Sequence, residues 1–254
     1  MAPQFSPLPD PAHPAHVGSV LLGPQPVKIL TSIMAATTAD LREAAREEQK
    51  LDVDILEWRA DFFESRDLNS FIAAALELKQ LAEKPVLWTL RSSAEGGHGP
   101  VGDEYLALVR GMAQSGLLEA VDMELSRGIT AEDVALAHSC GTAVIVSCHN
   151  FSATPAFSEM QKTFDTMAAT GADVLKLAVM PLSPEDVLSL MQATLWARRT
   201  FERPVISMSM GPWGALTRVA GALFGSSATF ASTFAPSAPG QYDVATARRL
   251  MKEL

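Results

Sequence analysis

Between residues 27 and 254 the chain repeats one pattern eight times, a short apolar run followed by a stretch with helical periodicity. The apolar runs lie at 27–34, 54–59, 85–90, 120–125, 142–148, 174–178, 204–208 and 228–233. The helical stretches lie at 39–50, 68–81, 102–115, 130–139, 155–169, 184–200, 214–223 and 244–254. Strands that alternate with helices form parallel sheets, because each helix returns the chain to the same edge. Eight such units within 254 residues predict an α/β fold of the (β/α)8 TIM-barrel type.

The alternative fold for such alternation is an open, doubly wound sheet. The glycine-rich phosphate-binding fingerprint that follows the first strand of a dinucleotide-binding sheet is absent here. Two helix starts carry capping patterns, Ser183 before Pro184 and Thr130 with Asp133 at the third helical position. The sequence therefore predicts a single barrel domain over residues 17–254.

The first residues form a separate compositional segment. Residues 1–16 contain five prolines among small and polar residues, which predicts an extended, disordered tail. The apolar segments 17–22 and 27–33 flank the turn residues 23–26, so we expect an N-terminal strand pair ahead of the barrel. A basic segment followed by an apolar one is missing at the N-terminus, and we expect no signal peptide.

Charge and cysteine content exclude several classes of protein. The net charge of −9 and the pI near 5.0 argue against non-specific nucleic-acid binding. The two cysteines, Cys140 and Cys148, supply neither a disulfide framework nor a metal framework, which favours the reducing cytoplasm. No apolar run is long enough to span a bilayer, so we expect no membrane partner.

Polar and ionisable residues follow one predicted strand after another. They are Glu57, Arg59, Asp61, Thr89, Arg91, Glu95, Asp122, Glu124, Ser147, His149, Asn150, Lys176, Arg218, Ser237 and Gln241. In a barrel the carboxyl ends of the strands meet on one face, so we expect these side chains to gather in one pocket. Its arginines would attract an anionic small molecule despite the negative net charge.

Lys176 lies inside the apolar run Val174–Ala178. A buried lysine favours its neutral amine, which is a nucleophile for carbonyl carbon in Schiff-base enzymes. The alternative is an edge strand from which Lys176 points to solvent. His149, at the end of the preceding strand, is a natural proton shuttle, and Glu95 is a plausible orienting partner for it.

Glu57, Arg59 and Asp61 are two residues apart, so those within regular strand share one face. The two acids would then hold Arg59 in a fixed geometry, and the alternative for Asp61 is a purely structural ion pair. A metal site is weakly supported, because no acid or histidine pair has ligand spacing on one helix.

Taken together, the motifs resemble those of the type I 3-dehydroquinate dehydratases, the Schiff-base-forming dehydroquinases of the shikimate pathway. The matching motifs are Glu57-x-Arg59-x-Asp61, Thr89-x-Arg91 with Glu95-Gly96-Gly97, Ser147-x-His149-x-Phe151 with Thr154-Pro155, Lys176 in its strand, Met208-Ser209-Met210-Gly211 with Arg218, Phe224-Gly225-Ser226, and Ser237-Ala238-Pro239-Gly240-Gln241. The similarity runs from residue 27 to the C-terminus. It implies a barrel enzyme, usually homodimeric, that uses no metal or cofactor and converts 3-dehydroquinate to 3-dehydroshikimate and water, in either the shikimate or the quinate pathway.

The resemblance also assigns roles to single residues. It implies that Lys176 forms the imine, that His149 moves protons and that Glu95 orients His149. Arg218 would hold the substrate carboxylate. The residues expected to bind hydroxyls or shape the pocket are Glu57, Arg59, Arg91, Ser237 and Gln241, the last two on a closing loop. Burial and the charges of Arg59, Arg91 and Arg218 are expected to favour the neutral amine of Lys176.

Two positions depart from the family pattern. Asn150 stands where aspartate is usual after the histidine, which removes a negative charge and is expected to alter the pKa of His149 or the pH optimum. Thr217 stands where serine is common before the arginine, and it keeps the hydroxyl. Two alternative functions remain at this point, a class I aldolase-type lyase and a catalytically inactive barrel that binds a quinate-type ligand.

Overall fold

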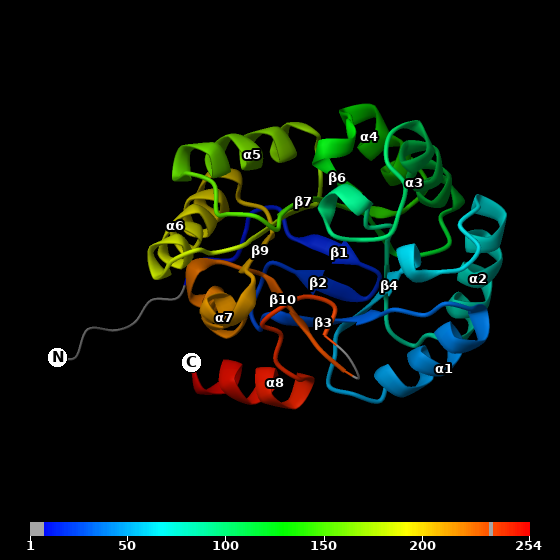
Figure 1. Ribbon diagram of the computed structural model, residues 1–254, viewed down its shortest axis with the longest axis horizontal. Coiled ribbons are helices and arrows are strands. Elements are labelled where there is room, and N and C mark those ends of the chain that lie inside the picture. The colour runs from blue at the N-terminus through cyan, green and yellow to red at the C-terminus, as the bar shows by residue number, and fades with distance from the viewer. Residues whose placement is uncertain (1–7, 234–235) are drawn as a thin grey trace.

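The structure is a computed structural model that describes residues 8–233 and 236–254, and eight parallel strands form its centre (Figure 1). They are β3 (Lys28–Ile33), β4 (Ile55–Arg59), β5 (Val86–Thr89), β6 (Ala120–Glu124), β7 (Ala143–Asn150), β8 (Val174–Val179), β9 (Val205–Ser209) and β10 (Ala228–Ala231). The hydrogen-bonded order is β10-β3-β4-β5-β6-β7-β8-β9. Ser227, just before β10, donates its backbone N–H to the carbonyl of Val205 in β9. The two ends of the sheet therefore approach each other, and the predicted barrel is confirmed.

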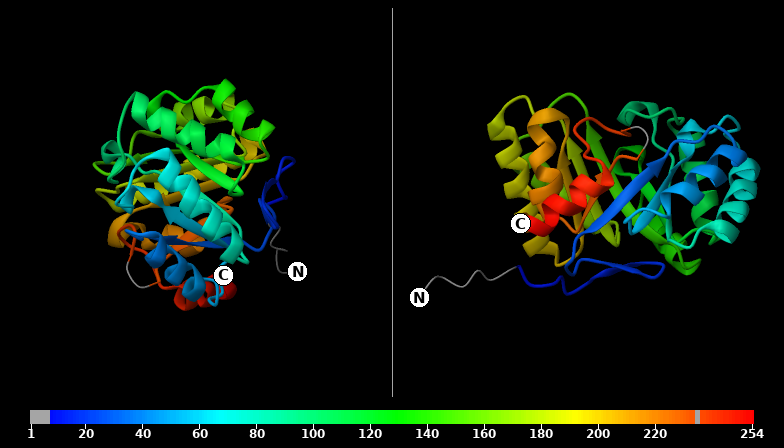
Figure 2. Two further views of the ribbon diagram at one scale, coloured as in Figure 1. Left: turned by 90° about the vertical axis from the view of Figure 1, so that its right-hand side faces the viewer. Right: turned by 90° about the horizontal axis from the view of Figure 1, so that it is seen from below.

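Within the described ranges, eight helices cover the outside of the barrel (Figures 1 and 2). They are α1 (Thr38–Glu48), α2 (Leu68–Leu81), α3 (Asp103–Ser115), α4 (Ala131–Ser139), α5 (Phe157–Ala169), α6 (Pro184–Phe201), α7 (Gly211–Ala220) and α8 (Val244–Glu253). Short 3₁₀ turns η1 (Ala60–Phe62), η2 (Ser93–Glu95), η3 (Leu125–Arg127) and η4 (Gly221–Phe224) lie between them. Ser183 caps α6 ahead of Pro184, and Asp133 accepts the backbone N–H of Thr130 at 3.0 Å, so both predicted caps are present.

Two apolar layers hold the barrel together. The larger layer lies between strands and helices and includes Trp58 and Trp88, which both contact Phe71 edge to face. The smaller layer fills the interior near the strand starts, where Leu30 and Ile55 are fully buried. This packing fixes the strand ends on the opposite side of the barrel, where polar side chains can gather.

The N-terminal strand pair differs in detail from the predicted one. It consists of β1 (Ala15–Val17) and β2 (Val20–Leu22), which pair antiparallel, and β3 belongs to the barrel instead. The turn lies at Gly18, whose positive φ of 56° suits glycine, and not at residues 23–26. The apolar side chains of the pair join the interior layer of the barrel, and Figure 2 shows the pair beneath it.

The expectation of a disordered tail over residues 1–16 is wrong for residues 8–16. Arg198 donates to the carbonyl of Pro9 at 2.6 Å, and the backbone N–H of His13 donates to Glu202 at 2.9 Å. Residues 8–16 therefore pack against the barrel. At their end, β1 pairs with β2, and Ala15 joins the interior apolar layer. The part of the expected tail at residues 1–7 lies outside the described residues. Within the described ranges, no helix is both long and apolar enough to cross a membrane.

Candidate active site

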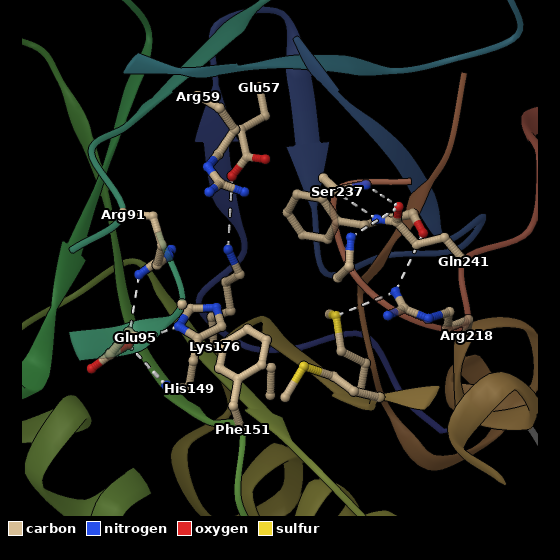
Figure 3. A pocket seen from close by; sticks show the side chains of 16 residues that line it. Glu57, Arg59, Arg91, Glu95, His149, Phe151, Lys176, Arg218, Ser237 and Gln241 are labelled. Carbon is tan, nitrogen blue, oxygen red and sulfur yellow. Dashed lines mark hydrogen bonds and ion pairs between the residues drawn. The ribbon is translucent and has the colours of Figure 1, made fainter. Parts of the chain in front are cut away.

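One pocket at the carboxyl ends of the strands brings together the nine residues to which the resemblance assigns roles (Figure 3). These are Glu57, Arg59, Arg91, Glu95, His149, Lys176, Arg218, Ser237 and Gln241. Six other polar residues expected in this pocket do not line it, namely Asp61, Thr89, Asp122, Glu124, Ser147 and Asn150. Apolar and small residues complete the wall, namely Gly96, Phe151, Ala178, Met208, Met210, Phe230 and Ala238. Figure 3 shows Glu95 and His149 on one side of the pocket and Arg218, Ser237 and Gln241 on the other.

Lys176 points into this pocket from β8, which pairs with β7 on one side and β9 on the other. The side chain is buried, so the alternative of a solvent-facing lysine on an edge strand is wrong. Its Nζ lies 3.1 Å from Asp122 Oδ2, 3.9 Å from Glu57 Oε1 and 4.6 Å from the centre of the Phe230 ring.

The charged groups that contact Lys176 are therefore carboxylates, and not the arginines that the sequence led us to expect. Asp122 and Glu57 stabilise the ammonium form of the lysine. Burial opposes ionisation of Asp122, but Arg91 and Lys176 hold the pKa of its carboxyl well below the usual range. Lys176 therefore lies against two carboxylates, and it attacks a carbonyl only as the unprotonated amine.

His149 ends in the same pocket and is bound to Glu95. Glu95 Oε2 lies 2.8 Å from His149 Nδ1 and also accepts the backbone N–H of His149 at 3.0 Å. Burial, together with the charges of Arg91 and Lys176, holds the pKa of His149 well below its ordinary value. The imidazole is therefore neutral near pH 7, with Nδ1 facing Glu95 and the other ring nitrogen able to accept a proton.

Arg91 is the centre of a buried ion-pair network. Its guanidinium lies 2.9 Å from Glu124, 3.0 Å from Asp122 and 3.6 Å from Glu95. Burial alone would lower the pKa of Arg91, but these carboxylates outweigh it and raise the pKa. Three carboxylates already surround the guanidinium of Arg91. We therefore expect Arg91 to hold these carboxylates in place and to form part of the pocket wall.

Arg59 and Glu57 do not contact each other as the spacing suggested. Arg59 donates two parallel hydrogen bonds to the fully buried Asp61, at 2.7 and 2.9 Å. Glu57 instead accepts from Ser32 at 2.5 Å and from Thr89 at 2.8 Å. Asp61 lies in η1, beyond the end of β4, so the alternation of a strand no longer applies to it. Asp61 is thus a structural partner that fixes Arg59 at the pocket wall.

Arg218 is the cation of the pocket that lacks an acidic partner. Within residues 8–233 and 236–254, no carboxylate lies within ion-pair distance of it, and its buried Nε has no hydrogen-bond partner. One terminal nitrogen donates to the carbonyl of Pro239 at 2.9 Å. Burial lowers the pKa of Arg218 to about 10, so it stays charged at neutral pH. A buried, uncompensated guanidinium is suited to bind an incoming carboxylate.

The segment with Ser237 and Gln241 closes the other side of the pocket. Gln241 Oε1 accepts the backbone N–H of Ser237 at 2.8 Å, and its Nε2 donates to Ser237 Oγ at 3.0 Å. Ser237 Oγ in turn donates to Ser32 at 3.0 Å, which links this segment to Glu57. Gly240 has a φ of 81°, and a side chain there would collide with the carbonyl of Gly211.

Comparison with known proteins decides the family. The family model for type I 3-dehydroquinase matches residues 29–254. The chain belongs to this family. It is 40% identical over 240 residues to the 3-dehydroquinate dehydratase of Listeria monocytogenes serotype 4b (strain F2365), which covers 92% of this chain and 95% of that protein. It is 39% identical over 241 residues to that of Escherichia coli O1:K1 / APEC, with coverages of 92% and 96%.

Solved structures agree with this assignment. The 3-dehydroquinate dehydratase of Geobacillus kaustophilus HTA426 superposes with a TM-score of 0.91 at 37% identity, over 96% of this chain and 97% of that chain. The type I 3-dehydroquinate dehydratase of Clostridium difficile, whose crystal structure contains covalently modified comenic acid, gives a TM-score of 0.89 at 34% identity. It covers 94% of this chain and 96% of that chain.

Both departures of this type I dehydroquinase from the family pattern have local structural partners. Asn150 Oδ1 accepts the backbone N–H groups of Ser152 and Ala153 at 2.9 and 3.0 Å, which begins the loop after β7. Thr217 donates its hydroxyl to the carbonyl of Gly214 and accepts the backbone N–H of Ser209. The hydroxyl of Thr217 therefore ties α7, and with it Arg218, to the end of β9.

Sequence reasoning placed Asp122 among the polar residues at the strand ends but gave it no role in the dehydroquinase site, although it contacts Lys176 directly. The signal was present, because Asp122 and Glu124 alternate along one strand and so face the same side. Ser32 and Ser126, which donate hydrogen bonds to the site carboxylates Glu57 and Glu95, were missed. Ser147, which donates to Asp122, was named in a motif but given no role. Serines carry little signal in a sequence, since they occur throughout turns and strands.

Proposed function

We propose that this type I 3-dehydroquinase dehydrates 3-dehydroquinate to 3-dehydroshikimate through an imine at Lys176, as a step of the shikimate pathway. The observation that carries the proposal is the pairing of two features in one pocket. Lys176 is buried next to the His149–Glu95 pair, and the uncompensated Arg218 lies on the other side. A substrate with a ketone and a carboxylate can engage both features at once.

The proposed chemistry follows from the weakness of a ketone as an electron sink. Lys176 passes one ammonium proton to His149 and attacks the carbonyl carbon. The carbonyl oxygen takes up this proton from His149 and a second one from the attacking nitrogen, and it leaves as water to give a protonated imine. His149 then removes a proton from the carbon next to the imine carbon. The iminium stabilises the resulting carbanion far better than a ketone would. His149 returns this proton to the departing β-hydroxyl, and water hydrolyses the product imine to free Lys176.

The remaining side chains position the substrate in this scheme. Arg218 binds the carboxylate, and Glu95 keeps His149 in its orientation. Glu57, Arg59, Ser237 and Gln241 contact the hydroxyls, whereas Arg91 orders the carboxylates around Lys176. This scheme uses protein side chains and water alone.

A trapping experiment tests the proposal. The protein should turn over 3-dehydroquinate, and borohydride added during turnover should inactivate it and add the mass of the reduced adduct to the peptide that contains Lys176. An adduct at another lysine would contradict the assignment of Lys176. Turnover without any adduct would contradict the imine, and absence of turnover would leave the inactive ligand-binding barrel as the better description.

Arg218→Ala should reduce kcat/KM for 3-dehydroquinate by about ten- to a hundred-fold, the effect of losing a charge-assisted hydrogen bond of roughly 1.5–3 kcal/mol. Arg218→Lys should restore part of the loss, because lysine keeps the charge but lacks the two parallel donors. Steady-state kinetics give both values. A small ketone without a carboxylate is the control, and it should react with Lys176 equally in all three proteins. An equal loss with this ketone would mean that Arg218 acts on Lys176 and not on the carboxylate.

We also propose that the chain forms a homodimer in the cytoplasm. Four large apolar side chains are more than half exposed on α6, α7 and the segments that precede them, namely Leu182, Leu188, Trp213 and Leu216. The two helices pack together through Val187, Met191 and Ala220, so the exposed side chains belong to neighbouring elements. Such apolar surface favours association. Both cysteines are free, which suits a reducing compartment.

Leu188→Glu should convert the dimer into a monomer in analytical ultracentrifugation, because a charge placed in an apolar interface loses its hydration. Leu76→Glu is the matched control, since Leu76 is an exposed leucine on the distant helix α2. It should leave the dimer intact. A wild-type protein that sediments as a monomer, or a Leu188→Glu variant that stays dimeric, would contradict this interface.

A further inference from the structure

The carboxylate of Glu95 has a partner on each oxygen. Its Oε2 accepts from the backbone and faces the imidazole of His149. Its Oε1 accepts a hydrogen bond of 2.5 Å from the hydroxyl of Ser126. Ser126 lies in η3, directly after β6, and does not line the pocket. Its oxygen also accepts from Arg127 Nε at 3.3 Å, and among the described residues that line the pocket its hydrogen-bond partner is Glu95.

Charged groups of both signs surround Glu95 and act in opposite directions on its pKa. A single hydrogen-bond donor to its carboxylate can therefore change its protonation state. The titratable or charged groups that face the Glu95–His149 pair are Arg91 after β5, Asp122 and Glu124 of β6, Arg127 of η3, Cys148 of β7, Lys176 of β8 and Arg59 of β4. Burial and Glu124 raise the pKa of Glu95 to about 7, while Arg91 and the Ser126 hydroxyl oppose this rise. Glu95 thus lies near the balance between its two protonation states.

We propose that Ser126 is a positioning residue that keeps Glu95 ionised and aimed at His149 at neutral pH. A hydroxyl donor stabilises a carboxylate and not a carboxylic acid. The ionised Glu95 accepts a hydrogen bond from His149 when the imidazole carries its proton on Nδ1. In this tautomer the other ring nitrogen of His149 is free to act as the base. The inference rests on the proposed roles of His149 and Glu95, and it adds a residue that the motifs of the family resemblance do not contain.

The direction in which Ser126→Ala should shift the pH profile follows from the need for an ionised Glu95. Glu95 is active as a carboxylate, so activity falls as the pH drops through its pKa. Ser126→Ala removes a donor to the charged form, which raises this pKa and moves the acid limb of the kcat/KM profile to higher pH. We expect a shift of about 0.5 to 1 pH unit, because Ser126 is exposed and water replaces part of the lost hydrogen bond.

Two measurements on four proteins test the proposal: wild type, Ser126→Ala, Ser126→Thr and Ser93→Ala. Ser126→Thr keeps the hydroxyl and should restore the wild-type behaviour. Ser93 is the matched control, an exposed serine on η2 beside Glu95 that makes no side-chain hydrogen bond within the described ranges. The first measurement is a ¹³C NMR titration of the Glu95 carboxyl in the protein without substrate. The second is the pH profile of kcat/KM with 3-dehydroquinate.

The expected result is a parallel upward shift of the Glu95 titration and of the acid limb in Ser126→Ala alone. An unchanged Glu95 titration in Ser126→Ala overturns the inference, whatever the kinetics show. A shifted titration with an unchanged acid limb overturns the part of the inference that concerns catalysis. If the wild-type protein fails to turn over 3-dehydroquinate, the proposed function is wrong, and the NMR titration still decides whether Ser126 controls Glu95.

Discussion

Lys176→Arg should lower turnover of 3-dehydroquinate by at least about 10⁴-fold, the scale of losing a catalytic nucleophile, although the positive charge is kept. A guanidinium does not deprotonate near neutral pH and cannot form an imine. Asp122 and Glu57, which contact the lysine, can still pair with the arginine, so the fold should survive. Turnover is measured by the appearance of the conjugated product, and folding by thermal unfolding.

The trapping experiment gives a second measure of the same substitution. Borohydride with 3-dehydroquinate should no longer add mass to the peptide that contained Lys176. Lys28→Arg is the matched control, because Lys28 opens β3 at the opposite end of the barrel and should have no effect on turnover or trapping. Lys176→Met removes the charge as well and should be equally inactive. Substantial activity in Lys176→Arg would mean that the carbonyl is activated without a covalent bond to this residue.

His149→Ala should reduce kcat by about 10²- to 10⁴-fold, the usual contribution of a general acid–base group. The neutral imidazole that burial maintains in this site is the base for the α-proton, and alanine leaves nothing to replace it. Lys176 keeps its amine, so borohydride should still trap an adduct there. Steady-state kinetics measure the loss in kcat, and mass spectrometry measures the adduct.

A histidine outside the pocket serves as the control for this substitution. His138 is paired with Asp173 at 2.8 Å on the surface, and His138→Ala should leave kcat unchanged. Near wild-type turnover in His149→Ala would move the proton transfer to another group. Glu57, which lies 3.9 Å from Lys176 Nζ, is then the next candidate, whereas Glu124 is already bound by Arg91 and Ser92.

The contacts made by Lys176 and Arg59 show what the sequence alone left open. Alternation places Glu57 and Arg59 on one face of β4, but it does not say which acid the arginine meets. The answer depends on the 3₁₀ turn η1, which brings Asp61 back against Arg59 and leaves Glu57 to Ser32 and Thr89. In the same way, the arginines expected around Lys176 are occupied by carboxylates or lie elsewhere in the pocket.

The sequence by itself determined the eight-fold alternation, the barrel and the residues that gather at its mouth. These features follow from local periodicity and from one topological fact, that parallel strands joined by helices all end on the same side. The tertiary structure alone decided which of these side chains contact each other at the carboxyl ends of the strands. Asp122 reaches Lys176, and Ser126 reaches Glu95, from elements 54 and 31 residues away. Such pairs depend on strand stagger and side-chain rotamers, which non-local packing fixes and no short segment encodes.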